Sequence, residues 1–246
     1  MTTKLFLAGA TGVVGRSLIP FLLEAGHKVT GTTRTANGKA KLEAVGVTVT
    51  VVDVFDARAL EAAVELASPD VLIHQLTDLS GGLDPHSPNE GLKRNARLRR
   101  EGTANLVRAA TRSGVKRVIA QSIGWAYASR SGPYVETDPL DIAATGARAI
   151  SVLDGVIPLE SAVLDQNAFE GLILRYGQLY GPGTWSDEPS GASPVHVEAA
   201  AYAAFLAVDH GRPGVYNIAE PGGALAVDKA WNELGWRPGV RVPERA

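Results

Sequence analysis

The feature that most constrains this chain is the alternation of short apolar runs with helical patterns along its first half. Predicted strands at 5–8, 29–33, 47–52, 71–74 and 118–120 alternate with predicted helices at 13–25, 39–44, 57–66 and 94–113. Repeats of a strand and a helix form a parallel sheet with right-handed crossovers, and helices cover both faces of such a sheet. We therefore predict the α/β class, with a Rossmann-type doubly wound parallel sheet.

The second half of the chain has a less regular pattern. It predicts a helix at 147–165 that Pro158 interrupts, strands at 172–175 and 215–218, and helices at 198–209 and 229–234. No linker separates two independent units, so residues 1–246 are predicted to form a single domain. A small C-terminal lobe, built mainly by 180–246, is predicted to cap the sheet.

A glycine-rich turn follows the first predicted strand and opens the first predicted helix. Its residues include Gly9, Thr11, Gly12, Val13, Val14 and Gly15. Glycine lets the chain turn sharply, lets a pyrophosphate approach the backbone, and lets the helix pack close to the strand. The helix N-terminus then offers free N–H groups to the phosphates. The pattern predicts a dinucleotide site, and the alternative is a tight turn without a ligand.

The end of the second predicted strand indicates which dinucleotide binds. NAD sites usually carry an acidic residue about 20 residues after the glycines, where it bonds the ribose 2′-hydroxyl. Here Arg34 stands at that distance, and no acidic residue lies between Lys28 and Lys41. A guanidinium, with Lys39 and Lys41 nearby, suits a 2′-phosphate. We predict NADP(H) over NAD(H); the alternative is a solvated surface arginine.

Asp53 lies at the carboxyl end of the third predicted strand, directly after Val52, and two roles remain open for it. Its carboxylate can accept a hydrogen bond from the adenine amino group, or it can cap the helix that begins near Ala57.

Composition excludes several classes of protein. The 246 residues carry a net charge of −2, which argues against a nucleic-acid partner. There is no cysteine, so disulfides, thiolate catalysis and Cys-ligated zinc are excluded. The histidines lack the spacing of a metal pair, and no metal site is predicted. No run reaches the ~18 apolar residues of a membrane span, and no signal peptide precedes the first strand. We expect a cytoplasmic protein with no membrane partner.

Several further motifs accompany the glycine-rich turn. They are Asp53-Val54, 101–106 (EGTANL), 174–177 (LRYG), 179–183 (LYGPG), 195–198 (VHVE), 216–218 (YNI) and 233–238 (ELGWRP). With these motifs the chain resembles the extended and atypical short-chain dehydrogenase/reductases, the NAD(P)-dependent epimerase/dehydratase-like proteins. The resemblance implies a Rossmann core, a nicotinamide cofactor and a small substrate lobe. It also implies a homodimer formed through helices near 94–112 and 147–165. The predicted cofactor-binding residues are Gly9, Thr11, Gly12, Val13, Val14, Gly15, Arg34, Asp53, Val54, Leu76 and Tyr176.

One departure from that family concerns its acid–base residues. The family uses a Tyr-x-x-x-Lys pair on a helix, and none of the six tyrosines here has a lysine four residues later. Alignment on Glu160 places Val152 at the tyrosine and Val156 at the lysine, and neither can transfer a proton. Alignment on Tyr127 places Ile123 at the family's Ser/Thr, and Ser122 lies one residue earlier.

A second departure precedes Gly102-Thr103. Arg99 replaces the family's asparagine, and Asn95, one helical turn earlier, is predicted to compensate. Arg99 also belongs to a basic group with Lys93, Arg94, Arg97 and Arg100. This group is either a solvated helix face or a site for an acidic substrate or partner. The loop at 81–88, which contains His86, is a candidate for the substrate mouth.

Two functions follow from an intact cofactor site without the usual acid. The first is a reductase of an unidentified small organic substrate that needs no such acid, such as an alkene or iminium polarised by its own chemistry. Ser122 and Tyr127 are the catalytic candidates, and Tyr176 or Arg148 can also orient the substrate. The alternatives are a backbone hydrogen bond for Ser122 and packing against Trp125 for Tyr127. The second function is a catalytically inactive NADP(H)-binding redox sensor or partner-binding protein. Epimerases and dehydratases are disfavoured because they must oxidise an alcohol.

Overall fold

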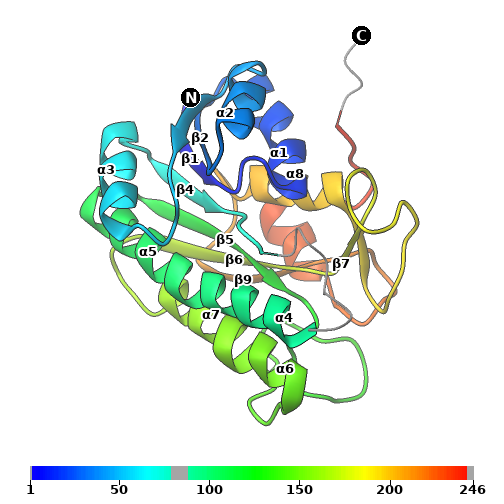
Figure 1. Ribbon diagram of the computed structural model, residues 1–246. Helices are drawn as coiled ribbons and strands as arrows, with labels where there is room; N and C mark the ends of the chain where they lie inside the picture. Colours follow the sequence, from blue (N-terminus) through cyan, green and yellow to red (C-terminus); the bar gives the residue numbers. More distant parts are fainter. Residues whose placement is uncertain (1, 79–87, 243–246) are drawn as a thin grey trace.

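A computed structural model describes residues 2–78 and 88–242, and its centre is a seven-stranded parallel sheet (Figure 1). The strands follow the order β3-β2-β1-β4-β5-β6-β9. They are β1 (Lys4–Ala8), β2 (Lys28–Thr33), β3 (Thr48–Val51), β4 (Val71–His74), β5 (Arg117–Ile123), β6 (Glu170–Tyr176) and β9 (Gly214–Ile218). The strand order reverses between β1 and β4, so the crevice for a ligand lies at their carboxyl ends. The predicted Rossmann-type fold is confirmed.

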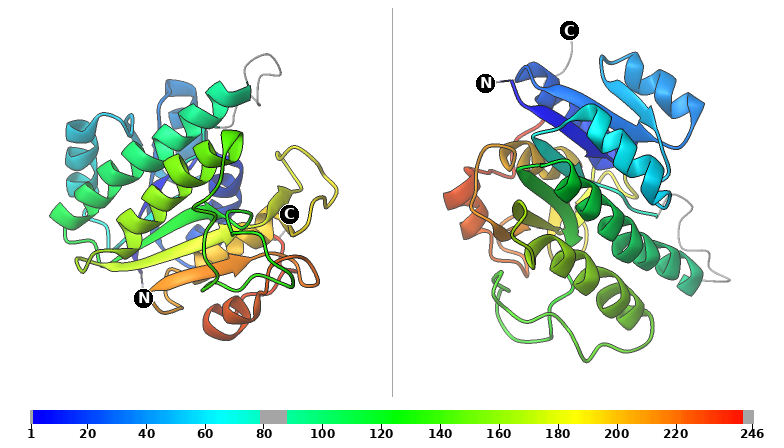
Figure 2. Two further views of the ribbon diagram at one scale, coloured as in Figure 1. Left: turned by 90° about the horizontal axis from the view of Figure 1, so that it is seen from below. Right: turned by 90° about the vertical axis from the view of Figure 1, so that its left-hand side faces the viewer.

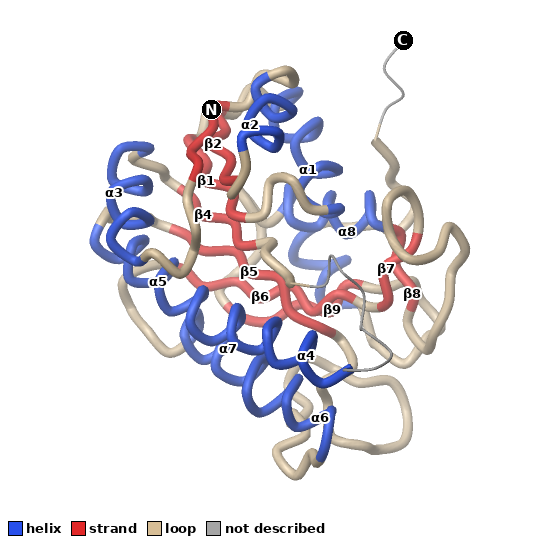
Figure 3. The backbone as a smooth tube through the Cα atoms, viewed as in Figure 1, coloured by secondary structure: helices blue, strands red, loops and turns tan. Residues whose placement is uncertain are grey.

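Helices cover both faces of the sheet, which appears as the central red layer of Figure 3. One face carries α1 (Val13–Glu24), α2 (Ala36–Glu43) and α8 (Val197–Leu206). The other carries α3 (Ala57–Ala67), the run α4 (Pro88–Arg97), η1 (Leu98–Gly102) and α5 (Thr103–Arg112), and the run α6 (Gly146–Ser151), η2 (Val152–Val156) and α7 (Ile157–Leu164). The last two runs lie side by side in Figures 1 and 2.

The two faces bury separate apolar cores because side chains of a strand alternate between the faces of its sheet. On β1, Leu5 and Leu7 pack towards α1 and α8, whereas Phe6 and Ala8 pack towards α3 and α5. The rings of Phe21 in α1 and Tyr202 in α8 lie 5.2 Å apart. The sheet is therefore held rigidly between two helical layers, and its carboxyl edge is a fixed platform.

The range 180–246 divides between the main sheet and smaller elements. Helix α8 and strand β9 belong to the Rossmann core. A two-stranded parallel sheet, β7 (Gln178–Tyr180) with β8 (Pro194–His196), lies beyond the end of β6, and the π-helical turn η3 (Ala230–Leu234) packs on the α8 side. Only the part of 180–246 outside α8 and β9 is therefore available to cap the sheet.

Two predicted helices differ from the observed ones. The helix predicted from residue 94 starts at Pro88, and the helix predicted to break at Pro158 runs on. Pro158 lies at the first positions of α7, directly after the π-helical turn η2. The N–H of Ile157 bonds the Val152 carbonyl in the π-helical pattern, and this wider turn before Pro158 lets the helix continue although the proline has no N–H to donate.

None of the helices within 2–78 and 88–242 is long and apolar enough to cross a membrane. The loop proposed as a substrate mouth, apart from Pro88, lies outside these described residues.

Candidate functional site

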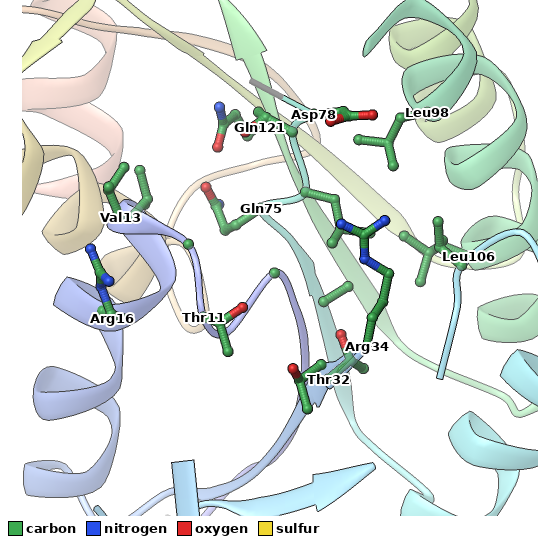
Figure 4. A pocket seen from close by; sticks show the side chains of 18 of the residues that line it. Thr11, Val13, Arg16, Thr32, Arg34, Gln75, Asp78, Leu98, Leu106 and Gln121 are labelled. Atoms are coloured by element: carbon green, nitrogen blue, oxygen red, sulfur yellow. The ribbon is translucent and has the colours of Figure 1, made fainter. Parts of the chain in front are cut away.

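A cavity of about 590 Å³ opens at the carboxyl ends of β1 to β5, and we call it the first cavity (Figure 4). It extends from the end of β2, where Arg34 lies, past the glycine-rich turn to Gln75 and Gln121 at the ends of β4 and β5. Of the predicted cofactor-binding residues, those that line it are Gly9, Thr11, Gly12, Val13, Val14, Arg34, Asp53, Val54 and Leu76.

The glycine-rich turn brings backbone atoms too close for any side chain. Gly9 has φ +93°, and a Cβ there would lie 2.6 Å from the backbone of Gln75. A Cβ on Gly15 would lie 2.2 Å from the carbonyl oxygen of Gly9. Gly15 therefore lies behind the cavity and sets how closely α1 approaches β1. Gly12 caps α1 at its N-terminus, so the free N–H groups of the first helical turn face the cavity.

Arg34 is exposed at the end of β2 and lines the cavity beside Thr32 and Thr33. Directly after it, Thr35 caps α2 by accepting a hydrogen bond from the N–H of Gly38 at 3.0 Å. The cap turns the chain away, so Lys39 lies on α2, where it pairs with Glu43 at 3.7 Å. Lys39 and Lys41 do not line the first cavity, and Arg34 is the cation at its β2 end.

Asp53 and Val54 line the cavity after β3. The Asp53 carboxylate accepts a hydrogen bond from the Phe55 N–H at 2.9 Å. The cap of α3 is Asp56, whose carboxylate accepts from the Ala59 N–H at 3.0 Å. The capping alternative for Asp53 is therefore wrong, and its adenine contact stays a prediction.

Gln75 follows β4 and lines the cavity although it is only 4% exposed. Its Nε2 donates to the hydroxyl of Tyr176 at 3.3 Å, and its Oε1 has no partner among the described residues. Tyr176 is fully enclosed below it, outside the cavity lining, and burial raises its pKa. Tyr176 therefore does not line the first cavity, and its cofactor contact stays a prediction. Sequence patterns gave no signal for Gln75, Gln121 or Arg16, which also line this cavity.

His74, at the end of β4, is buried and neutral. Its Nδ1 accepts the N–H of Leu76 at 3.2 Å, so the proton is on Nε2, which lies 3.0 Å from the Thr103 hydroxyl. Burial, and then the charge of Arg99, lower the pKa of His74 to about 4. The ring therefore fixes the backbone of Leu76 at the cavity wall.

The catalytic candidates Ser122 and Tyr127 belong to a buried polar network. The Ser122 hydroxyl donates to Glu160 at 2.6 Å, and Glu160 forms an ion pair with Arg175 at 2.6 Å. The Arg175 guanidinium lies 4.7 Å from the centroid of the Tyr127 ring, and the Tyr127 hydroxyl donates to Asn217 at 2.6 Å. Burial raises the pKa of Tyr127. Ser122 bonds a carboxylate rather than the backbone, and neither residue lines the first cavity, so their catalytic roles stay predictions.

The positions aligned above with the family's acid–base residues meet in an apolar cluster. Ile123, Val152 and Val156 pack together with Ala126, and all four are buried. They come from the end of β5 and from η2, which the fold places next to each other. This cluster offers no proton donor at these positions.

Arg99 lies apart from the rest of the basic group. Its residue exposure is 4%, whereas the side chains of Lys93, Arg94, Arg97 and Arg100 are at least half exposed. A Cβ on Gly155 would lie 3.3 Å from its Cδ, so this glycine leaves room for the arginine between η1 and η2. Burial lowers the pKa of Arg99 to about 10. Asn95 is buried and accepts the Asp78 N–H at 2.9 Å, which fixes the chain after β4.

A second, smaller cavity of about 330 Å³ lies at the carboxyl ends of β5 and β6. Tyr127 and Arg148, two of the predicted substrate-orienting residues, line it, and Ser122 and Tyr176 do not.

A doubly wound sheet with a glycine-cradled crevice at its switch point defines the class of dinucleotide-binding α/β proteins. Residues 5–213 match the model of the NAD dependent epimerase/dehydratase family, and the chain belongs to this family. Over 182 residues it is 40% identical to a 3-diazoavenalumate denitrifying reductase from Streptomyces sp.. The match covers 74% of this chain and 58% of that relative, so the chain spans little more than half of the relative's length.

Solved structures of nucleotide-sugar enzymes share the fold. A dTDP-glucose 4,6-dehydratase double mutant from Streptomyces venezuelae, with NAD and DAU bound, has a TM-score of 0.76 at 20% identity, covering 97% of this chain and 92% of that one. A UDP-glucose 4-epimerase from Thermotoga maritima, with UDP-glucose, has a TM-score of 0.75 at 18% identity, covering 97% and 94%. These likenesses establish the fold alone.

Proposed function

We propose that this chain is an NADP(H)-dependent reductase whose acceptor requires no proton from a tyrosine. The observation that carries the proposal is the pairing of an open first cavity with the apolar cluster of Ile123, Val152 and Val156. The cavity supports cofactor binding, and the cluster limits the chemistry that can follow.

The strand order supports a defined direction for the dinucleotide. The order β2-β1-β4-β5 sets Arg34, the glycine-rich turn, Gln75 and Gln121 in succession along one edge, with about 4.8 Å between neighbouring strands. The turn at the N-terminus of α1 would hold the pyrophosphate. The adenosine half would then lie towards Arg34, and the nicotinamide half towards Gln75.

The proposed preference for NADP(H) over NAD(H) rests on Arg34. Its guanidinium would form charge-assisted hydrogen bonds with the 2′-phosphate. The carboxylates of the described residues that line the first cavity, Asp53 and Asp78, follow β3 and β4 rather than β2. Arg16, one turn into α1, adds a second cation on the side of the pyrophosphate.

Gln75 would hold the nicotinamide half. One end of its amide bonds Tyr176 and the other end has no partner within the described chain. Because an unsatisfied buried polar atom is costly, a ligand that supplies a partner gains affinity. The hydroxyls of the nicotinamide ribose and the carboxamide are groups that can bond an amide.

When bound, reduced nicotinamide supplies a hydride. The apolar cluster offers no acid at the aligned positions, so a simple ketone would receive no proton from them and would be left with an unprotonated oxygen. The reductase relative is named for the denitrifying reduction of a diazo compound. When hydride replaces the diazonium group of an arenediazonium ion, the ring carbon gains the hydride and N₂ leaves. The charge therefore balances without a proton from the protein. We propose an acceptor of this self-activated type.

The test follows NADPH oxidation by its absorbance, with an arenediazonium salt, an activated alkene and a simple ketone as acceptors. The proposal predicts turnover of a self-activated acceptor and none of the ketone, with deuterium from 4-deuterated NADPH recovered on the product carbon. Comparable reduction of the ketone would contradict it. The apolar cluster also favours a second candidate, an NADP(H)-binding protein without catalysis, and NADPH binding without any oxidation would support that candidate.

A further inference from the structure

The second cavity is separate from the cofactor's cavity and has its own set of lining residues. They are Gly124, Trp125, Tyr127, Ser129, Tyr134, Asp141, Arg148, Gly177, Gln178, Ala192, Ser193 and Ala224. They come from the segment after β5, from α6, from the segments around β7 and β8, and from the segment after β9. Its volume of about 330 Å³ is at the lower end of the range for small-molecule pockets.

The two cavities adjoin at the end that would hold nicotinamide. Gln121 lines the first cavity and Gly124 the second, and three residues of extended chain span at most about 10 Å. Leu179 lines the first cavity, and its chain neighbour Gln178 lines the second. A molecule in the second cavity would therefore lie beside Gln75 and Gln121.

Aromatic side chains form the walls of the second cavity. The rings of Tyr127 and Tyr134 are stacked, with centroids 5.0 Å apart and an angle of 5° between their planes. Trp125 lines the same cavity and is 45% exposed, so a large apolar ring stands at its opening. The Tyr127 ring lies between Tyr134 and the Arg175 guanidinium, so the stacked tyrosines offer a ligand their edges, and Trp125 offers it a ring face. A flat ligand ring can stack on Trp125 and make edge contacts with the tyrosines.

The inner part of the cavity presents an unpartnered hydroxyl. Ser193 is 4% exposed, and its Oγ has no hydrogen-bond partner among the described residues. The backbone N–H of Ser193 donates to Oε1 of Gln178 at 3.0 Å, which holds the residue in place. A fixed hydroxyl without a partner is the group that a polar substituent of a ligand satisfies.

Arg148 is the polar group on the exposed side, with a side chain that is 40% exposed. Its Nε donates to Asp141 at 2.6 Å, and its two terminal nitrogens donate to the carbonyl oxygens of Trp125 and Tyr127 at 2.9 and 2.7 Å. These bonds use three of the five N–H groups of a guanidinium, so two remain for an acceptor.

We propose that the second cavity binds the substrate, and that this substrate is a planar aromatic compound with a hydrogen-bonding substituent at each end. One substituent would bond the Ser193 hydroxyl, and the other would accept from Arg148 at the opening. This inference rests on the proposed function, because the cavity gains its role from the neighbouring nicotinamide.

The experiment is calorimetry on the full chain saturated with NADP⁺, with trans-4-hydroxycinnamate as the probe. Its matched partner, trans-3-(4-hydroxycyclohexyl)acrylate, keeps both end groups and lacks the flat ring. We expect one molecule of the cinnamate to bind about tenfold more tightly than the partner. Equal affinity for the two, no binding of the cinnamate, or Trp125-dependent binding of UDP-glucose would overturn the proposal. A chain that binds NADP⁺ but no cinnamate refutes only this inference, whereas failure to bind NADP⁺ refutes the proposed function.

Two substitutions locate the binding. Trp125→Ala is expected to weaken cinnamate binding about tenfold, and Leu66→Ala, at an 87% exposed residue of α3 that lines neither cavity, to leave it unchanged. Ser193→Ala is expected to weaken binding and to raise the melting temperature of the ligand-free protein by about 2–4 °C, because it removes an unsatisfied group. Unchanged cinnamate affinity in both Trp125→Ala and Ser193→Ala would contradict the assignment.

Discussion

The two halves of the sheet's carboxyl edge differ in how they are filled. The half at β1, β2 and β4 is an open cavity shaped by backbone atoms, with glycines where a Cβ would collide. The half at β5, β6 and β9 contains the smaller second cavity together with the apolar cluster and the buried network of Ser122, Glu160 and Arg175. The difference shows that close backbone contacts shape the first half, whereas contacts between buried side chains shape the second.

The largest effect is expected from a change in the open half. Gly15→Ala would place a Cβ 2.2 Å from the Gly9 carbonyl oxygen, so α1 must move away from β1. We expect NADPH affinity to fall about 100-fold or more, measured by the fluorescence of bound NADPH. Gly239→Ala, where a Cβ meets nothing within 4 Å, is the control and should bind as the unmodified chain does. Normal affinity in Gly15→Ala would show that the turn does not seat the cofactor.

In the half at β5, β6 and β9, Glu160→Gln is expected to affect stability rather than NADPH binding. It removes the partner of Arg175, whose side chain is 5% exposed, and leaves a buried charge without compensation. The free energy of unfolding should fall by about 3 kcal/mol in a denaturant titration. NADPH affinity should stay within about twofold.

Glu43→Gln, in an exposed pair with Lys39, is the control and should change stability by less than about 0.5 kcal/mol. If Glu160→Gln lowers NADPH affinity and leaves the free energy of unfolding unchanged, the assignment of cofactor binding to the first half and stability to the second is contradicted.

His74, at the border between the halves, predicts a smaller, pH-dependent effect. Its folded pKa of about 4 lies below the ordinary value of 6.5, so the unfolded chain binds a proton first as the pH falls. The stabilisation is present above pH 6.5 and is lost progressively towards pH 4. Between pH 7 and pH 5.5 the loss should be about 1 kcal/mol.

The measurement compares unfolding of the unmodified chain and His74→Asn at both pH values, because the difference between the two isolates His74 from the carboxylates. Parallel pH profiles would mean that His74 titrates normally in the folded state.

The sheet could be predicted from the sequence because apolar runs and helical periods are local signals. Strands β7 and β8 gave no such signal, since each has three residues and their pairing joins Gln178 to Pro194 across a loop. The early start of α4 at Pro88 and the π-helical turn η2 before Pro158 depend on packing between the two helical runs.

The candidate site likewise contains residues that local sequence signals predict and residues that only packing reveals. The glycine-rich turn is visible in the sequence because only glycine satisfies its backbone contacts, and the position of Arg34 follows from the strand before it. Gln75 and Ser193 are ordinary polar residues in the sequence, and only their buried atoms, which have no hydrogen-bond partner within 2–78 and 88–242, mark them. Arg99 belongs to a charged run, and the space left by Gly155 separates it from that run.

Calorimetric titration of the unmodified chain and of Arg34→Met with NADPH and NADH tests the central claim most directly. We predict one bound NADPH, with an affinity at least about tenfold above that for NADH, and loss of this difference in Arg34→Met. Equal affinity for NADH and NADPH in the unmodified chain, or no heat with either dinucleotide, would contradict the account.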